Sequence, residues 1–300
     1  MKAALFVALG VVAAIYLVAW ASRLRGEHRT TWRHVVVGAV TNFFDTLGIG
    51  SFATTTAFYK VVPELRRVVS DRLIPGTLNV GHTLPAILQA FIFIAIIAVD
   101  VRTLVAIIAA AVAGAWLGAG QVAKWNKQTV RLVMGVALLV AASLMTAAQL
   151  GLVPAGGDAL GLSGARLGVA VAASLLLGAL MTMGIGYYGP CIILVSLLGM
   201  NPRTAFPIMM GACAFLMPIA STRFIRAQAY EPRAALGLAL GGIPAVLVAA
   251  FIVRSLPLGA VRWLVVVVVL YAATLLLAAA ASERRIAAST PALDDAGSGG

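Results

Sequence analysis

The chain has 300 residues, of which 62% are hydrophobic and only 11% are charged. Soluble globular proteins average about 45–50% apolar and about 25% charged residues, so this composition predicts a polytopic membrane protein. The net charge of +12 does not indicate a nucleic-acid partner, because the basic residues lie in short loops between apolar runs, where they orient a chain in the bilayer. Two cysteines exclude a disulfide scaffold and a four-cysteine metal site, and we expect neither a metal nor a cofactor.

The N-terminal segment is apolar over residues 3–20 and is followed by a loop rich in arginine. The stretch Ala19-Trp20-Ala21 imitates a small-x-small cleavage site, so a signal peptide is one interpretation. Cleavage would export the basic loop, against the tendency of Lys and Arg to stay in the cytoplasm. We therefore predict that residues 1–34 form an uncleaved transmembrane helix and a cytoplasmic loop.

The basic loops set the expected topology. Most Lys and Arg residues lie in or at the edge of the loops 22–34, 59–73, 121–130 and 223–233, which are predicted to be cytoplasmic. The apolar segment between the first two loops must then enter and leave the membrane on one side. Three full spans follow it, and the second half repeats this plan. An odd number of spans in each half inverts the second half relative to the first.

The fold prediction is therefore an all-α polytopic membrane protein with two inverted repeats and an extra N-terminal span. If both broken segments instead cross the membrane fully, the repeats are parallel. The expected divisions after the N-terminal part are a first repeat at 35–152, a connector at 153–165, a second repeat at 166–281 and a disordered tail at 282–300.

A Gly-Ile-Gly motif interrupts one apolar segment in each half. Gly48 and Gly50 lie in the first half, and Gly184 and Gly186 lie in the second. Non-helical backbone inside a bilayer is tolerated only where protein or an aqueous site surrounds it. Interrupted hydrophobic segments in corresponding halves are typical of the binding site of a secondary transporter.

Hydroxyl side chains follow both motifs, at Ser51, Thr54 and Thr55 in the first half and at Tyr187 and Tyr188 in the second. A half-helix that begins after a glycine break presents free N–H groups and a positive dipole end, which favour an anion. We expect these hydroxyls and the motif glycines to line a small-anion site near the middle of the membrane. The alternative is that the threonines bond to their own helix and the tyrosines anchor at the interface.

Two titratable residues are candidates for proton coupling. Asp45 is the only acid well inside an apolar segment, and an ionisable residue there is a functional candidate by default. His82 could relay a proton. The alternatives are that Asp45 caps the half-helix after the break and that His82 satisfies a local hydrogen bond. Ser51 with His82 is the only pair that an intramembrane hydrolase could use, and no motif supports it, so we expect no catalytic residues.

These motifs, with the turn Asn201-Pro202-Arg203-Thr204-Ala205 and the small-residue helix after it, resemble the TauE/SafE sulfite exporter family. The resemblance covers most of residues 35–280, although bulkier residues replace the later glycines of the family's motif. It implies a permease of the inner (cytoplasmic) membrane that moves sulfite, a sulfonate or a similar oxyanion, driven by an ion gradient. A small carboxylate is the alternative substrate, and a homodimer stays open.

Overall fold

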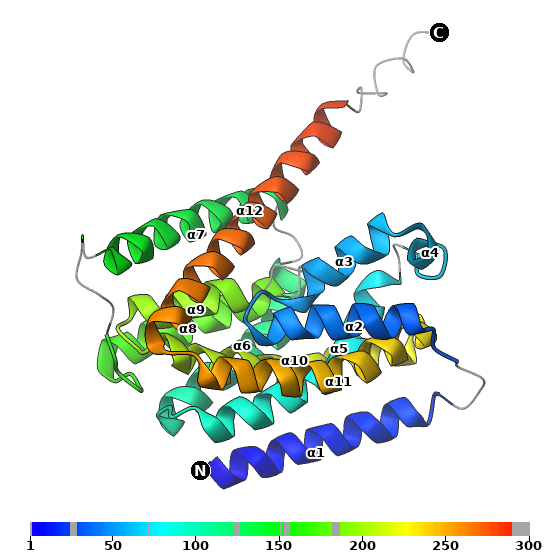
Figure 1. Ribbon diagram of the computed structural model, residues 1–300, viewed down its shortest axis with the longest axis horizontal. Coiled ribbons are helices and arrows are strands. Elements are labelled where there is room, and N and C mark those ends of the chain that lie inside the picture. The colour runs from blue at the N-terminus through cyan, green and yellow to red at the C-terminus, as the bar shows by residue number, and fades with distance from the viewer. Residues whose placement is uncertain are drawn as a thin grey trace.

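The computed structural model describes residues 2–24, 29–70, 73–122, 127–150, 152, 157–181 and 187–289. These residues are almost entirely helical (Figure 1). The helices are α1 Lys2–Ala21, α2 Trp32–Thr46, α3 Ser51–Val61, α4 Pro63–Arg66, α5 Ile74–Ile96, α6 Val101–Val122, α7 Lys127–Gln149, α8 Gly164–Met181, α9 Tyr188–Leu197, the short 3₁₀ helix η1 Pro202–Thr204, α10 Ala205–Arg226, α11 Pro232–Ser255 and α12 Leu258–Ser289.

Five of the described helical segments are long and apolar enough to cross a membrane. They are α1, α5, α8, the segment Pro202–Arg226 and the part Pro232–Val253 of α11. Large apolar side chains cover outward faces: on α1, Val7, Ile15 and Val18 are 66%, 61% and 71% exposed. Broad apolar surfaces of this kind suit lipid rather than water. The length of the helices and their outer surface both fit a helical membrane protein.

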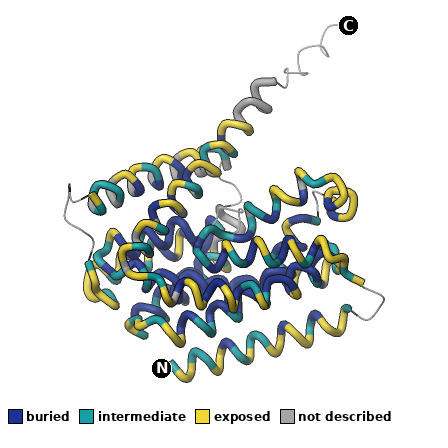
Figure 2. Tube along the Cα trace, in the orientation of Figure 1, coloured by how far each residue is buried: buried dark blue, intermediate teal, exposed yellow. Residues whose placement is uncertain are grey.

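The long helices α5 and α10 pack against each other at the centre of the molecule. To one side α2 lies along α11, which also packs on α5, and to the other α8 lies along α6, which also packs on α10. Helix α1 contacts α5 and α10 from one edge, while α7 and α12 pair at the opposite edge (Figure 1). Figure 2 shows the buried stretches concentrated in the central helices and α1 largely exposed.

Glycines allow the closest of these helix contacts. In the α2–α11 pair, a Cβ added to Gly38 or Gly241 would collide with the backbone of the facing helix. In the α6–α8 pair, the same is true of Gly114 and Gly178. Small residues let membrane helices approach closely enough for extensive van der Waals contact. Each pair is thus joined by a reciprocal set of glycines, one on either helix.

The chain leaves helical geometry between Thr46 at the end of α2 and Ser51 at the start of α3. Gly48 has φ +98° and Gly50 has φ +87°, values that L side chains rarely adopt. The N–H groups of Gly48 and Ile49 donate back to carbonyls of the last turn of α2, at 2.8 and 3.1 Å. This is the glycine-dependent helix end known as a Schellman motif. It satisfies carbonyls that would otherwise be unpaired in the protein interior.

The second Gly-Ile-Gly motif falls between α8, which ends at Met181, and α9, which begins at Tyr188. Gly184 and Gly186 lie outside the described residues, so their predicted geometry stays a prediction.

The segment predicted to connect the two halves is described from residue 157, and it packs against two turns of the core. The N–H of Asp100 donates to the carbonyl of Leu160 at 2.7 Å. The N–H of Asn201 donates to the carbonyl of Ala159 at 2.9 Å. These bonds hold the connector between the start of α6 and the turn before α10.

The C-terminal end differs from the expectation of a disordered tail from residue 282. Helix α12 continues to Ser289, and residues 290–300 lie outside the description. The added stretch contains Glu283, Arg284 and alanines, which have high intrinsic helix propensity. The predicted transmembrane span stopped before this stretch because several of its residues are polar. A fall in hydropathy marks the end of a span, but it does not by itself end a helix.

Candidate functional site

A buried carboxylate lies where the two half-helices α3 and α9 begin. Asp45, in the last turn of α2, is only 4% exposed. The N–H of Ser51, the first residue of α3, donates to its Oδ1 at 2.6 Å. The hydroxyl of Tyr188, the first residue of α9, donates to its Oδ2 at 3.4 Å. Both half-helices therefore begin at one carboxylate, although they belong to different halves of the chain.

Gln89 completes this cluster, and the sequence analysis missed it. Its Nε2 donates to Asp45 Oδ2 and to Thr46 Oγ1, each at 2.9 Å. Its Oε1 is 3.4 Å from the Tyr188 hydroxyl, whose single hydrogen can go to either Gln89 or Asp45. An amide in the apolar second half of α5 was the signal that could have marked Gln89 as a candidate, since a buried amide needs partners.

Asp45 has no cationic neighbour in the described core. None of the buried residues that the structure describes is a Lys or an Arg. Burying an ionised carboxylate without a cation is costly, even when hydrogen bonds compensate part of the loss. A residue of this kind inside a membrane protein is a functional candidate, and here it is also the N–H acceptor that links α2 to α3.

Helix α3 is fixed by buried hydrogen bonds along one face. Ser51, Thr55 and Tyr59 are spaced four residues apart, so they lie on the same side of the helix. We call these three residues the polar seam of α3. Their partners, in order, are Asp45, His82 and His34. The Thr55–His82 and Tyr59–His34 contacts measure 3.0 and 3.2 Å, so all three bonds of the polar seam end on titratable side chains.

The hydrogen bonds of His82 assign its proton. Its Nδ1 is 3.0 Å from Oδ1 of Asn42, an amide oriented by the bond from its own Nδ2 to the carbonyl of Gly38 at 2.7 Å. Since Asn42 Oδ1 can only accept, Nδ1 of His82 carries the hydrogen. In the neutral ring Nε2 is then an acceptor, and Thr55 donates its hydroxyl hydrogen to it. Both ring nitrogens are occupied.

The other predicted hydroxyls are arranged differently. Thr54 is only partly buried, and its hydroxyl donates to carbonyls of its own helix, those of Gly50 and Ser51, at 3.1 and 2.9 Å. For Thr54 the structure shows the local bonding that the alternative interpretation expects. Tyr187 precedes α9 and is 2% exposed. Thus the structure brings Ser51 and Tyr188 to Asp45 and Thr55 to His82, while Thr54 bonds within α3.

The described residues include no group of three or more His, Cys, Asp or Glu side chains that could hold a metal ion. Cys191 and Cys213 are both buried free thiols. Buried cysteines of this kind pack as small apolar residues.

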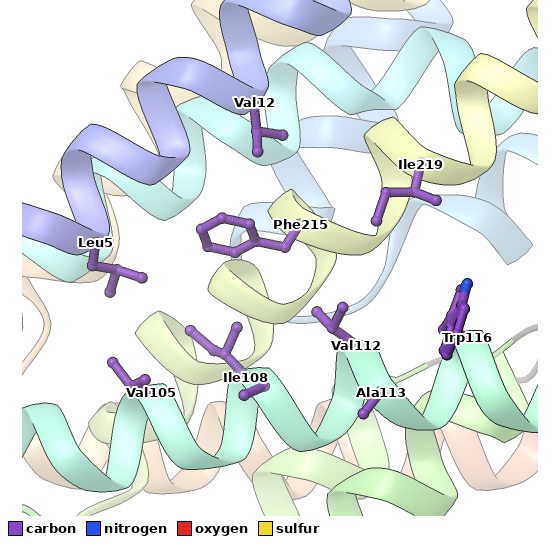
Figure 3. Close-up of a pocket in the computed structure, with 10 residues that line it drawn as sticks. Leu5, Val12, Val105, Ile108, Val112, Ala113, Trp116, Phe215 and Ile219 are labelled. Carbon is purple, nitrogen blue, oxygen red and sulfur yellow. The ribbon is translucent and has the colours of Figure 1, made fainter.

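An open groove of about 460 Å³ lies on the outer surface between α1, α6 and α10 (Figure 3). Figure 3 shows Phe215 of α10 projecting between Leu5 and Val12 of α1 and the side chains of α6. Its lining is apolar throughout, with Trp116 at one end. A groove with no converging polar groups does not select a polar solute, so the buried cluster around Asp45 is the better candidate site.

Comparisons with protein-family models, with curated proteins and with solved structures find no significant match to this chain. The resemblance to the TauE/SafE family therefore stays a prediction that rests on the motifs in the sequence.

Proposed function

We propose that this protein is a secondary transporter that carries a small anion across the cytoplasmic membrane and couples its movement to protons through Asp45. The observation that supports this proposal most directly is the meeting of α3 and α9 at the Asp45 carboxylate. Midplane sites in secondary transporters are built from the ends of broken helices contributed by two repeats. A buried acid at such a point can take up and release a proton as its surroundings change.

The packing of the helices supports two related halves. We pair α2 with α8, α3 with α9, α5 with α10, α6 with α11 and α7 with α12. Exchanging the halves converts the α2–α11 contact into the α8–α6 contact, and both occur. It converts the α5–α11 contact into the α10–α6 contact, and both of these occur as well. The central α5–α10 contact and the outer α7–α12 contact each map onto themselves, as expected across a two-fold axis.

The protonation of Asp45 links proton uptake to the anion. In the described arrangement the carboxylate accepts the Ser51 N–H, so it occupies the positive end of α3. A hydrogen bond to a charged acceptor is about twice as strong as one between neutral groups, so protonation weakens this contact. The Ser51 N–H then becomes free for an external anion. One proton and one anion thereby enter the site together without an embedded Lys or Arg.

The anion is proposed to be sulfite, a sulfonate or a similar oxyanion, because of the sequence resemblance to the TauE/SafE family. A small carboxylate is the alternative, since helix N-termini and hydroxyl groups bind either kind of anion. The intramembrane hydrolase is disfavoured by the ring of His82, because both of its nitrogens are engaged by Asn42 and Thr55 and neither faces Ser51 as a base.

The proposal is tested with purified protein in proteoliposomes. We expect labelled sulfite to enter faster than labelled sulfate or acetate, and a pH gradient to stimulate the flux. Empty liposomes and liposomes with heat-denatured protein provide the background rate. Flux equal to background for all three anions, with and without the gradient, would refute the proposed function. Faster acetate than sulfite flux would keep the transporter and change its substrate to a carboxylate.

The inverted arrangement of the repeats is tested by labelling single cysteines on a cysteine-free background. We expect positions in the loops 22–34 and 59–73 to be reached only from the cytoplasmic side. External labelling at 59–73 but not at 22–34 would mean that the first broken segment crosses the membrane fully, and the repeats would then be parallel.

A further inference from the structure

Two buried hydroxyl groups in the second half have no hydrogen-bond partner. The Ser174 hydroxyl, in the middle of α8, and the Tyr187 hydroxyl, just before α9, make no hydrogen bond to any described residue. Ser174 is 0% exposed and Tyr187 is 2% exposed. The Tyr187 hydroxyl has Ser174 and Cys191 within short range and Cys213 nearby, but neither the Ser174 nor the Tyr187 hydroxyl has a partner at hydrogen-bond distance and angle. They therefore form one local group within the core.

Hydroxyl groups without a hydrogen-bond partner are unusual in a protein interior. The large majority of buried polar side-chain atoms in proteins are hydrogen-bonded, and each exception needs an explanation such as a bound water or ligand. Two other buried hydroxyls among the described residues follow the rule. Ser196 of α9 donates to the carbonyl of Ile192 in its own helix at 2.8 Å, and Tyr16 of α1 donates to the carbonyl of Val80 at 2.7 Å. Ser174 could have bonded to its own helix in the same way, yet it does not.

We propose that Ser174 and Tyr187 form an anion subsite in the second half, where their two hydroxyls donate hydrogen bonds to the oxygen atoms of a small oxyanion. This inference rests on the proposed transport function and adds residues that select the substrate. Tyr188 is already engaged with Asp45 and Gln89, whereas the hydroxyl of Tyr187 remains free to serve the ligand. Ser174 was not singled out by its sequence pattern, because a lone serine in an apolar span more often bonds to its own helix.

The chemistry of the group favours an anion over a cation. A hydroxyl gives one hydrogen to an acceptor, and a phenol and an alcohol together can hold two oxygen atoms of an oxyanion such as sulfite. The neighbouring Cys191 and Cys213 add two further weak donors. The subsite lies beside α9, whose first residue contacts Asp45, so an anion held there is next to the group that we propose to carry the proton.

The test is sulfite binding to the purified full-length protein in detergent. Thermal unfolding is followed by tryptophan fluorescence over a series of sulfite concentrations, for wild type, Ser174→Ala and Tyr187→Phe. We expect each variant to weaken sulfite binding about tenfold or more, because it removes one hydrogen bond to a charged ligand. Without sulfite, we expect both variants to unfold at or above the wild-type temperature, because each removes an unsatisfied buried group.

Two matched substitutions serve as controls. Ser196→Ala removes a serine hydroxyl that bonds to its own helix, and we expect unchanged sulfite affinity. Tyr16→Phe removes a tyrosine hydroxyl that joins α1 to α5, and we expect a lower unfolding temperature without sulfite but unchanged affinity.

Three results would overturn the inference. Wild-type affinity in both Ser174→Ala and Tyr187→Phe would mean that the hydroxyls face only buried water. A marked loss of stability without sulfite in either variant would mean that its hydroxyl has a structural partner. If wild type itself binds none of sulfite, sulfate and acetate, the proposed function fails first and the subsite fails with it, and this outcome is distinguishable from the other two.

Discussion

The half-helices α3 and α9 hold matching places in the two halves but are attached to the core in different ways. Helix α3 is fixed by the polar seam, and the side away from the core is open, with Phe58 36% and Val61 77% exposed. Helix α9 is enclosed by apolar contacts, and Cys191 and Ile192 are completely buried. Besides its neighbour α8, it packs against α7, α10 and α12, whereas the main contacts of α3 are with α2, α4 and α5.

This difference suggests that the two half-helices depend on pH to different degrees. Apolar burial is not directional and does not depend on pH, so most of the attachment of α9 is expected to be insensitive to pH. Hydrogen bonds to Asp45, His82 and His34 depend on the protonation of these groups, so the attachment of α3 is conditional. We therefore expect the position of α3 to depend on protonation more than that of α9, which has one such bond, from Tyr188 to Asp45.

The largest effect is expected from breaking the helix pairs that carry the two half-helices. Gly241→Ala in the α2–α11 pair and Gly178→Ala in the α6–α8 pair each place a Cβ against the backbone of the facing helix. We expect each to lower the free energy of unfolding by roughly 3 kcal/mol or more, because backbone cannot repack. Thermal unfolding and membrane abundance measure this.

Gly168→Ala is the control in the same helix α8, since a Cβ there meets nothing within 4 Å. A mild effect of Gly178→Ala, equal to that of Gly168→Ala, would contradict the close packing of α6 and α8.

The next effect concerns transport. Asp45→Asn keeps an oxygen that can accept the Ser51 N–H but removes the charge that titrates. We expect stimulation of sulfite flux by a pH gradient to disappear, while the protein remains folded and abundant. Flux through proteoliposomes at several pH values measures this. Full retention of the pH response would reduce Asp45 to a cap for α3.

A smaller effect should distinguish the polar seam from the other hydroxyls of α3. Thr55→Val leaves Nε2 of His82 without its donor, and we expect it to destabilise the protein by about 1–3 kcal/mol. Thr54→Val removes a hydroxyl that bonds only within α3, and we expect little change. Denaturation of the two variants in one detergent makes the comparison. Equal stability of both would contradict the role of the seam.

The smallest effect is expected at the two acidic residues that precede α6 and α11, helices that we pair between the halves. Asp100 Oδ2 accepts the N–H of Thr103 at 2.8 Å, while Glu231 Oε1 accepts the N–H of Arg233 at 3.4 Å. Loss of a capping side chain costs about 1 kcal/mol, so we expect Asp100→Ala to be the more destabilising of the two changes. Equal unfolding temperatures for Asp100→Ala and Glu231→Ala would contradict this ranking.

The same cap has a defined pH dependence. The N–H and hydroxyl of Thr103 lower the pKa of the Asp100 carboxyl below its ordinary value. A lowered pKa in the folded state means that the contribution is complete above the unfolded pKa of about 4 and is lost as the pH falls through the folded value. Asp100→Asn should therefore remove part of the acid sensitivity below about pH 4 while keeping the cap. Unfolding curves at a series of acid pH values measure this.

The sequence predicts local features of this molecule better than its contacts. The end of α2 follows from Gly48 and Gly50, because two closely spaced glycines permit positive φ values that end a helix. The burial of Asp45 follows from its place in an apolar run. The role of Gln89 could not be read from the sequence, because it depends on which face of α5 turns toward α2.

The same limit applies to side chains near the second break. Tyr187 and Tyr188 are adjacent and looked equivalent in the sequence, yet only Tyr188 reaches Asp45. Neighbouring residues at the start of a helix point in directions about 100° apart, so the rotation of α9 decides which of the two meets the carboxylate. That rotation is set by tertiary packing and leaves no signal in a single sequence.

The reciprocal glycines of the α2–α11 and α6–α8 pairs restrict how this protein can change shape. Where backbone touches backbone, one helix cannot slide or rotate against its partner without a collision. We therefore expect each pair, which contains one helix from either half of the chain, to move as a unit. We expect displacement between the two pairs to involve α5 and α10, which pack between them and carry Pro85 and Pro218 in their interiors, and Pro244 gives α11 a similar bending point.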